Sequence, residues 1–154
     1  MAKVNLLLIE AFRITAKNLR NGKPYEWGHM GNCNCGNLAQ TLLNIDKKTI
    51  HEYAMVGVGD WTEQVNDYCP TSGMQMDKMI FGLLEKGLST NDLKHLEYLS
   101  DPLILSNLPE NTPILKNNNR EDVALYLETW ANVLENNLID NIKIVNNEEV
   151  LLYM

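Results

Sequence analysis

Long apolar runs are missing from this sequence, and their absence limits where the protein can reside. No stretch approaches the about 20 apolar residues that a membrane-spanning helix needs. The opening apolar run, Leu6 to Ile9, is too short for the core of a secretory signal and is followed by Glu10, with no small-residue cleavage site. We therefore expect a cytoplasmic protein.

Basic charge is scarce as well. The chain has 13 Lys and Arg against 20 Asp and Glu, which gives a net charge of −7, and its longest basic run is Lys47-Lys48. A chain of this kind repels the phosphate backbone of a nucleic acid and the surface of an anionic membrane. The sequence therefore predicts no nucleic-acid partner and no membrane partner.

Cysteine is rare, and its count is odd. Three cysteines are present, and two of them, Cys33 and Cys35, are separated by a single residue. This spacing and number are a poor basis for a disulfide framework in a chain of this length. We expect the thiols to be reduced, which agrees with a cytoplasmic location.

Internal repeats, low-complexity tracts and linkers rich in Pro, Gly or Ser are also missing. The apolar content is sufficient for one core, because 45% of the 154 residues are hydrophobic. A chain of this length lies within the usual range for a single domain. We expect residues 1–154 to form one helical domain.

The commonest recognisable patterns in the sequence are those that mark the start of a helix. Asp60-x-x-Glu63, Ser72-x-x-Gln75 and Ser89-x-x-Asp92 are capping patterns, and Asn119-x-x-Asp122 precedes the clearest helix, near 120–136. The predicted fold class is all-α, a compact globule of six or seven short helices. Three more helices are expected: one near residues 3–20, one that begins near 33–36 and one that begins at Asp46. The helix that starts at Ser89 should end at Asp101-Pro102.

Apolar residues recur at helical spacing and predict the core. In the first helix, which should end at Asn21-Gly22, the expected buried stripe is Val4, Leu7, Leu8, Ala11 and Ile14. Leu38 and Leu42 should be buried in the second helix. In the last, the expected stripe is Val123, Tyr126, Leu127, Trp130 and Leu134.

The final stretch, 139–154, has two interpretations. Ile142 and Ile144 alternate with polar residues ahead of Asn146-Asn147, a pattern typical of a small C-terminal β-hairpin. A final helix capped by Asn146 is the alternative. An isolated hairpin is marginal in water, so its apolar face needs cover from the helices or from a partner subunit. A homodimer is accordingly one of our expectations.

The segment from Trp27 to Gln40 is unlike the rest of the chain, because it holds three glycines, three asparagines and two cysteines. Glycine permits positive φ or close backbone approach, and asparagine caps helices. We interpret the segment as a tightly turned loop that leads into a helix N-terminus near Cys35. The positive end of that helix should lower the pKa of a nearby thiol.

Two kinds of chemistry fit this segment. Cys35 is the candidate nucleophile, with His29 or His51 as its base and Gln40 or the loop N–H groups as oxyanion donors. Alternatively, three cysteines and a histidine match the Cys₃His set that zinc prefers, and the same thiolates suit copper(I). The ligands in that case are His29, Cys33, Cys35 and Cys69.

The less specific interpretation is that the cysteines only pack, since free cysteine is among the most buried residue types. Our first function hypothesis is a non-enzymatic domain that binds a small ligand, a metal or a protein partner through loop 27–40. The alternative is a cysteine-dependent hydrolase or transferase with Cys35 as nucleophile. A third is an oligomerising helical module with inert cysteines.

Overall fold

The computed structural model describes residues 2–3, 5–27, 33–44 and 78–152. All regular elements in these ranges are α-helices, and no strand occurs among them, which confirms the all-α prediction. The helices are α1 (Leu6–Arg20), α2 (Asn34–Leu42), α5 (Lys78–Glu85), α6 (Thr90–Tyr98), α7 (Pro102–Leu105) and α8 (Arg120–Leu152). Within the described ranges, no helix is both long enough and apolar enough to cross a membrane.

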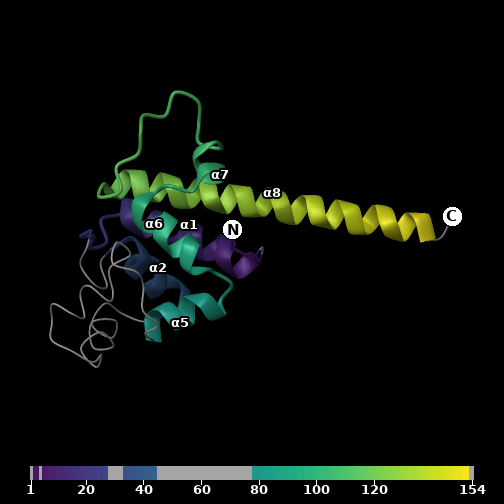
Figure 1. The fold of residues 1–154 in the computed structure, drawn as a ribbon, viewed down its shortest axis with the longest axis horizontal. Coiled ribbons are helices and arrows are strands. Elements are labelled where there is room, and N and C mark those ends of the chain that lie inside the picture. Colours follow the sequence, from purple (N-terminus) through teal and green to yellow (C-terminus); the bar gives the residue numbers. More distant parts are fainter. Residues whose placement is uncertain (1, 4, 28–32, 45–77, 153–154) are drawn as a thin grey trace.

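The body of the protein is built around α1. One side of α1 lies along the first half of α8 and another packs on α2, which in turn contacts α5 and α6 (Figure 1). α7 packs on α8. The helices expected from Asp46 and at Trp61 lie outside the described residues.

α1 ends where the sequence indicates but begins at Leu6, about three residues later than predicted. The side chain of Asn5 accepts a hydrogen bond from the Leu8 N–H at 2.8 Å and caps the helix. The helix ends at Asn21, and Gly22 follows with φ of +92°, a conformation that suits glycine.

The buried stripe of α1 differs from the predicted one. Leu7 is 52% exposed and Ile14 is 41% exposed, whereas Phe12 and Leu19 are fully buried beside Leu8. The prediction was wrong here because the helix carries apolar residues on more than half of its circumference. The buried side of α1 is the one that carries Phe12, whose ring stacks on Trp130 of α8 with 4.2 Å between ring centroids.

The start of α8 follows the prediction closely. Asn119 Oδ1 accepts a hydrogen bond from the Asp122 N–H at 3.1 Å, as the capping pattern indicates. The predicted stripe is buried along its whole length: Val123, Tyr126, Leu127, Trp130 and Leu134 are at most 1% exposed. This stripe is the part of α8 that α1 covers.

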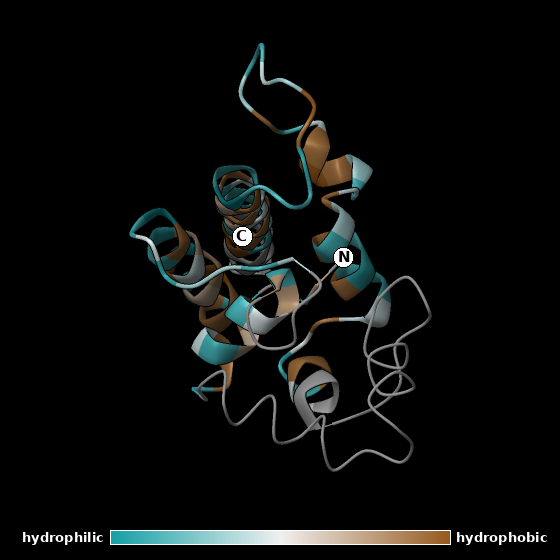
Figure 2. Ribbon diagram, turned by 90° about the vertical axis from the view of Figure 1, so that its left-hand side faces the viewer, coloured by the Kyte–Doolittle hydropathy of each residue, from teal (hydrophilic) through white to brown (hydrophobic). Residues whose placement is uncertain are grey.

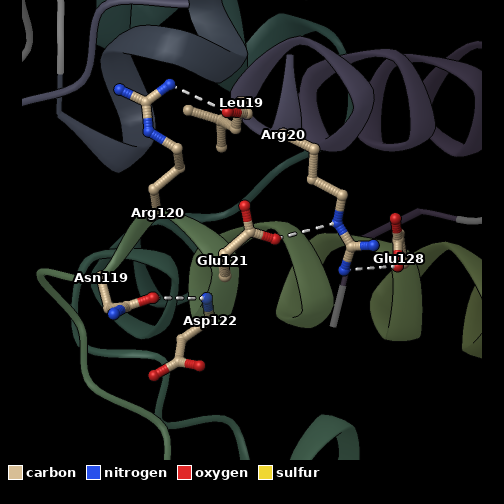
Figure 3. A network of polar contacts seen from close by, with 7 residues as sticks. All are labelled: Leu19, Arg20, Asn119, Arg120, Glu121, Asp122 and Glu128. Atoms are coloured by element: carbon tan, nitrogen blue, oxygen red, sulfur yellow. Dashed lines mark hydrogen bonds and ion pairs between the residues drawn. The ribbon is translucent and has the colours of Figure 1, made fainter. Parts of the chain in front are cut away.

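Polar contacts join the end of α1 to the start of α8 (Figure 3). The guanidinium of Arg120 donates to the Leu19 carbonyl at 2.9 Å, which occupies one of the carbonyls left open at the end of α1. Arg20 lies 3.1 Å from a carboxylate oxygen of Glu128 and 3.6 Å from one of Glu121. These contacts set α1 antiparallel to α8.

α6 ends earlier than predicted. Its start has the expected capping box, in which Ser89 and Asp92 exchange hydrogen bonds at 2.9 and 3.1 Å. However, the helix ends at Tyr98, where Leu99 takes a left-handed conformation with φ of +50°. Asp101 then caps the single turn of α7, in which Pro102 occupies the first position.

Residues 139–152 are helical. The hairpin prediction was wrong, and the alternative was right that the chain is helical after Asn146 but wrong that a separate helix begins there. α8 continues without interruption to Leu152, so there is neither a hairpin nor a new helix at Asn146. No glycine or proline follows Pro113 in the chain, so no helix-breaking residue interrupts α8. At 33 residues, α8 is also not a short helix.

Candidate functional site

The described part of the unusual segment lies where the N-terminus of α2 meets the C-terminus of α6. We call this contact the α2–α6 joint, and its central residues are Cys33, Asn34, Cys35 and Glu97. All four are buried. An α-helix leaves its first four N–H groups and its last four carbonyls without partners inside the helix. The joint supplies partners to both sets.

At the start of α2, the free amides are taken by the chain itself. The Cys35 N–H donates to Oε1 of Glu97 at 2.7 Å, and the Gly36 N–H donates to the Cys33 sulfur at 3.3 Å. The Asn37 N–H bonds to the Cys33 carbonyl at 2.9 Å. Cys33, rather than an asparagine, is therefore the N-cap. The predicted use of these amides as oxyanion donors was wrong for Cys35 and Gly36.

At the end of α6, the open carbonyls receive side-chain donors. Nδ2 of Asn34 lies 3.0 Å from the Leu96 carbonyl and 3.3 Å from that of Glu97. The indole N–H of Trp27 also donates to the Glu97 carbonyl, at 3.1 Å. Each helix end is thus capped by residues of the other segment, and the negative end of one helix dipole faces the positive end of the other.

A third stretch of chain joins this network just before α8. The Tyr25 hydroxyl lies 2.7 Å from Oδ1 of Asn34 and 2.9 Å from the Asn117 carbonyl. Nδ2 of Asn34 is 3.2 Å from the same carbonyl. Asn34 therefore holds together the loop before α2, the end of α6 and the extended segment before α8.

Burial controls the electrostatics of the joint. Glu97 is 2% exposed, and burial raises its pKa against the opposing effect of the hydrogen bond from the Cys35 N–H and the contacts of both thiols. Burial also raises the pKa of the Cys33 thiol and of the Cys35 thiol well above the usual value, and the neighbouring Glu97 raises both further. The predicted lowering of the thiol pKa was therefore wrong, because burial outweighs the field of the helix N-terminus.

The structure brings together two of the predicted site residues. Cys33 and Cys35 both lie at the joint, while His29, His51 and Cys69 fall outside the described residues. Gln40 is half-buried in α2. In the part of the chain that the structure describes, no three or more His, Cys, Asp or Glu side chains are arranged to hold a metal ion.

Glu97 and Asn34 are the residues that the sequence analysis missed. Glu97 follows the buried Leu93 by four residues and Leu96 by one, so it falls on the core side of α6. A charged residue on an apolar stripe is rarely buried without partners. That position was the signal that could have identified it as part of a polar cluster.

A second feature is the C-terminal part of α8, residues 139–152, which we call the arm. It runs past the body, and no other described segment lies beside it in Figure 1. Figure 2 views α8 nearly end-on and shows hydrophobic and hydrophilic residues along it. Ile139 is 43% exposed and Ile142 is 51% exposed at the point where the arm leaves the body.

The start of α1 adds a third apolar residue at this level. Arg13 of α1 bonds to Asn132 at 3.0 Å and to Glu135 at 2.6 Å. The two helices are antiparallel and rise equally per residue. The residue seven positions before Arg13 on α1 therefore lies at the same height along the helix axes as the residues seven positions after Asn132 and Glu135 on α8. Those positions are Leu6, which is 70% exposed, and residues 139 and 142.

The fold and these two features define a helical body with a buried polar joint and a projecting helical arm. No family model, curated protein or solved structure matches this chain.

Proposed function

We propose that this chain is a non-enzymatic binding domain that engages a protein partner through the arm of α8. One observation carries the proposal. Leu134, Leu138 and Ile142 follow one another at four-residue steps on one stripe of α8, and they are respectively fully buried, partly buried against the core, and 51% exposed. The apolar stripe of α8 that packs against α1 in the body therefore continues along the arm, where no described helix covers it.

The arm also lacks the usual support for a helix of its length. An isolated helix of fewer than about 12–15 residues is marginal in water, and most helical stability in proteins comes from packing of an apolar face. The arm contains three asparagines, Asn141, Asn146 and Asn147, and asparagine has weak helix propensity. A partner that covers the stripe supplies what the arm lacks.

The joint supports a non-catalytic assignment. Cys33 caps α2, Cys35 lies in its first turn, and both are buried beside the Glu97 carboxyl group, which disfavours the thiolate that nucleophilic catalysis requires. Alkylation of the native protein across pH tests the alternative of a Cys35 nucleophile. We expect both thiols to react slowly up to pH 9 and rapidly after unfolding. A single thiol that reacts fast below pH 7.5 would restore the enzyme hypothesis.

One observation favours metal binding as a second candidate function. Both thiols lie beside the Glu97 carboxyl group, although these three side chains are not by themselves arranged to hold a metal ion. With His29 and Cys69 added, this set suits zinc or copper(I). Elemental analysis of protein purified without a metal-affinity tag is the test. Near-stoichiometric metal that is lost in Cys33→Ser supports this candidate, and a metal-free protein removes it.

The partner-binding proposal is tested by unfolding Ile142→Asp in urea, at a concentration low enough to prevent association. If Ile142 faces a partner, its free energy of unfolding stays within about 0.5 kcal/mol of the wild-type value, as for other surface substitutions. Asn147→Asp adds the same charge on another stripe of the arm and serves as the control. A loss of more than about 1.5 kcal/mol in Ile142→Asp alone would mean that its own chain covers the stripe, which contradicts the proposal.

A further inference from the structure

We propose that Asn21-Gly22, at the end of α1, is a site of spontaneous covalent modification whose rate is set by the opening of the last turn of α1. The backbone nitrogen of Gly22 attacks the side-chain amide carbon of Asn21 once that turn has opened. The chain contains nine glycines, and Gly22 is the only one that follows an asparagine.

The reaction needs water but no catalyst, in keeping with the thermal lability of asparagine. As the bond from the Gly22 nitrogen to Cγ of Asn21 forms, the Gly22 nitrogen loses its proton and the side-chain nitrogen of Asn21 leaves as ammonia. The product is a five-membered succinimide. Water then opens the ring at either carbonyl and leaves an aspartate or an isoaspartate at position 21. Both products carry one more negative charge than the asparagine.

The surroundings of the pair favour this chemistry. Glycine has no side chain to obstruct its own nitrogen. Asn21 and Gly22 are both exposed, and a Cβ built at Gly22 would meet no atom beyond its chain neighbours within 4 Å. Arg20 and Lys23 flank the pair, and their positive charges favour the anion that develops as the Gly22 nitrogen loses its proton.

The helix end opposes the reaction. The Gly22 N–H donates to the Leu19 carbonyl at 3.2 Å, which holds its nitrogen in the helix cap. The ψ of Asn21 is 6°, whereas ring closure requires Cβ and the Gly22 nitrogen to lie on the same side of the Cα–C bond. The rotation that achieves this also breaks the bond from the Lys23 N–H to the Asn18 carbonyl, at 3.0 Å. The last turn of α1 must therefore open first.

Arg120 of α8 holds that turn closed. Its guanidinium donates at 2.9 Å to the Leu19 carbonyl, which is the same carbonyl that accepts from the Gly22 N–H (Figure 3). A reaction that is much slower than opening and closing proceeds in proportion to the population of the open state. The contact between Arg120 and α1 therefore controls how fast Asn21 is modified.

Peptide mapping by mass spectrometry of the full chain, incubated at pH 7.4, measures the rate at Asn21, and ion exchange separates the products by their extra charge. The reference is the same chain unfolded in guanidinium chloride. We expect the native rate to be about ten-fold lower than the unfolded rate, because two exposed hydrogen bonds must break before the ring can close. This comparison needs no variant.

Two arginine variants test the control by α8. Arg120→Ala should raise the native rate about three- to ten-fold, because a hydrogen bond from a charged donor is lost. Arg13→Ala is the matched control: it removes the bonds from α1 to Asn132 and Glu135 but leaves the end of α1 intact. It should change the rate less than about two-fold.

Each of three results would overturn the inference. Equal rates in the native and unfolded chains would mean that the end of α1 gives no protection. A native rate lower than the unfolded rate by more than about a thousand-fold would mean that only global unfolding exposes the pair. Equal acceleration by Arg120→Ala and Arg13→Ala would mean that the whole of α1, and not its last turn, must open.

Discussion

Glu97 offers the most informative perturbation, because it is a buried carboxyl group at the centre of the joint. The proposed change is Glu97→Gln, which keeps the length of the side chain and an oxygen that can accept from the Cys35 N–H, now 2.7 Å from Oε1. It removes the charge and replaces the other carboxyl oxygen with an NH2 group. Burial raises the pKa of Glu97, so the native state holds the proton more tightly than the unfolded chain does.

The sign of the pH dependence follows from that direction. Below the usual Glu pKa of about 4.3, both states are protonated and the charge costs nothing. As pH rises through the raised folded-state pKa, the unfolded chain ionises freely while the native carboxyl must ionise in a buried site, so the free energy of unfolding falls. Each unit of raised pKa corresponds to about 1.4 kcal/mol.

We therefore expect Glu97→Gln to be more stable than the wild type at pH 8 by more than the about 0.5 kcal/mol typical of neutral substitutions, and to match it at pH 4. Urea unfolding of both proteins with a chelator present, at pH 4, 6 and 8, measures the difference. Glu97→Ala is the control: it leaves the Cys35 amide without its acceptor and should cost about 1–3 kcal/mol at pH 4. Its cost should be smaller at pH 8, because it removes the buried charge as well. Destabilisation of Glu97→Gln at pH 8 would refute the reasoning, since it would mean that the charge itself stabilises the fold.

Four further substitutions test the joint, a cap and two turns by their effect on the free energy of unfolding. Asn34→Ala should cost about 2–4 kcal/mol, because the buried carbonyls that Asn34 bridges lose a shared donor; a cost below 1 kcal/mol would mean that water replaces it. Ser89→Ala should cost about 1 kcal/mol by removing the acceptor for the Asp92 N–H, as measured by thermal unfolding. Gly87→Ala should cost more than Gly22→Ala: both have positive φ, but a Cβ at Gly87 would meet a side-chain carbon at 3.2 Å, whereas at Gly22 it would meet open space. Equal costs for the two would show that only φ matters.

The parts of the fold that the sequence predicted correctly are those fixed by local rules. The caps at Ser89 and Asn119 and the end of α1 at Gly22 each depend on residues within one turn of the chain. The stripe of α8 was also correct, because large side chains repeat on one face only. Local pattern was enough wherever it allowed a single answer.

The predictions that were wrong concern features that depend on residues far apart in the sequence. α1 has apolar residues on two faces, and its packing on α8, where Phe12 stacks on Trp130, and on α2 determines which residues are buried. The thiol pKa is raised by burial in the folded core and then by Glu97, which is 62 residues from Cys35 along the chain. Alternation in the last 16 residues favoured a hairpin, but continuation of the helix from Arg120 prevails because nothing in the sequence ends it.

The joint and the arm have opposite relations to water, and this separates their roles. At the joint, the polar groups of two helix ends are matched with one another, so a ligand placed there must first displace bonds that hold the body together. At the arm, apolar area is presented without cover from any described helix, so a partner gains by burying it and displaces no bond of the body. Substitution at the joint should therefore change stability first, and substitution at Ile142 should change association first.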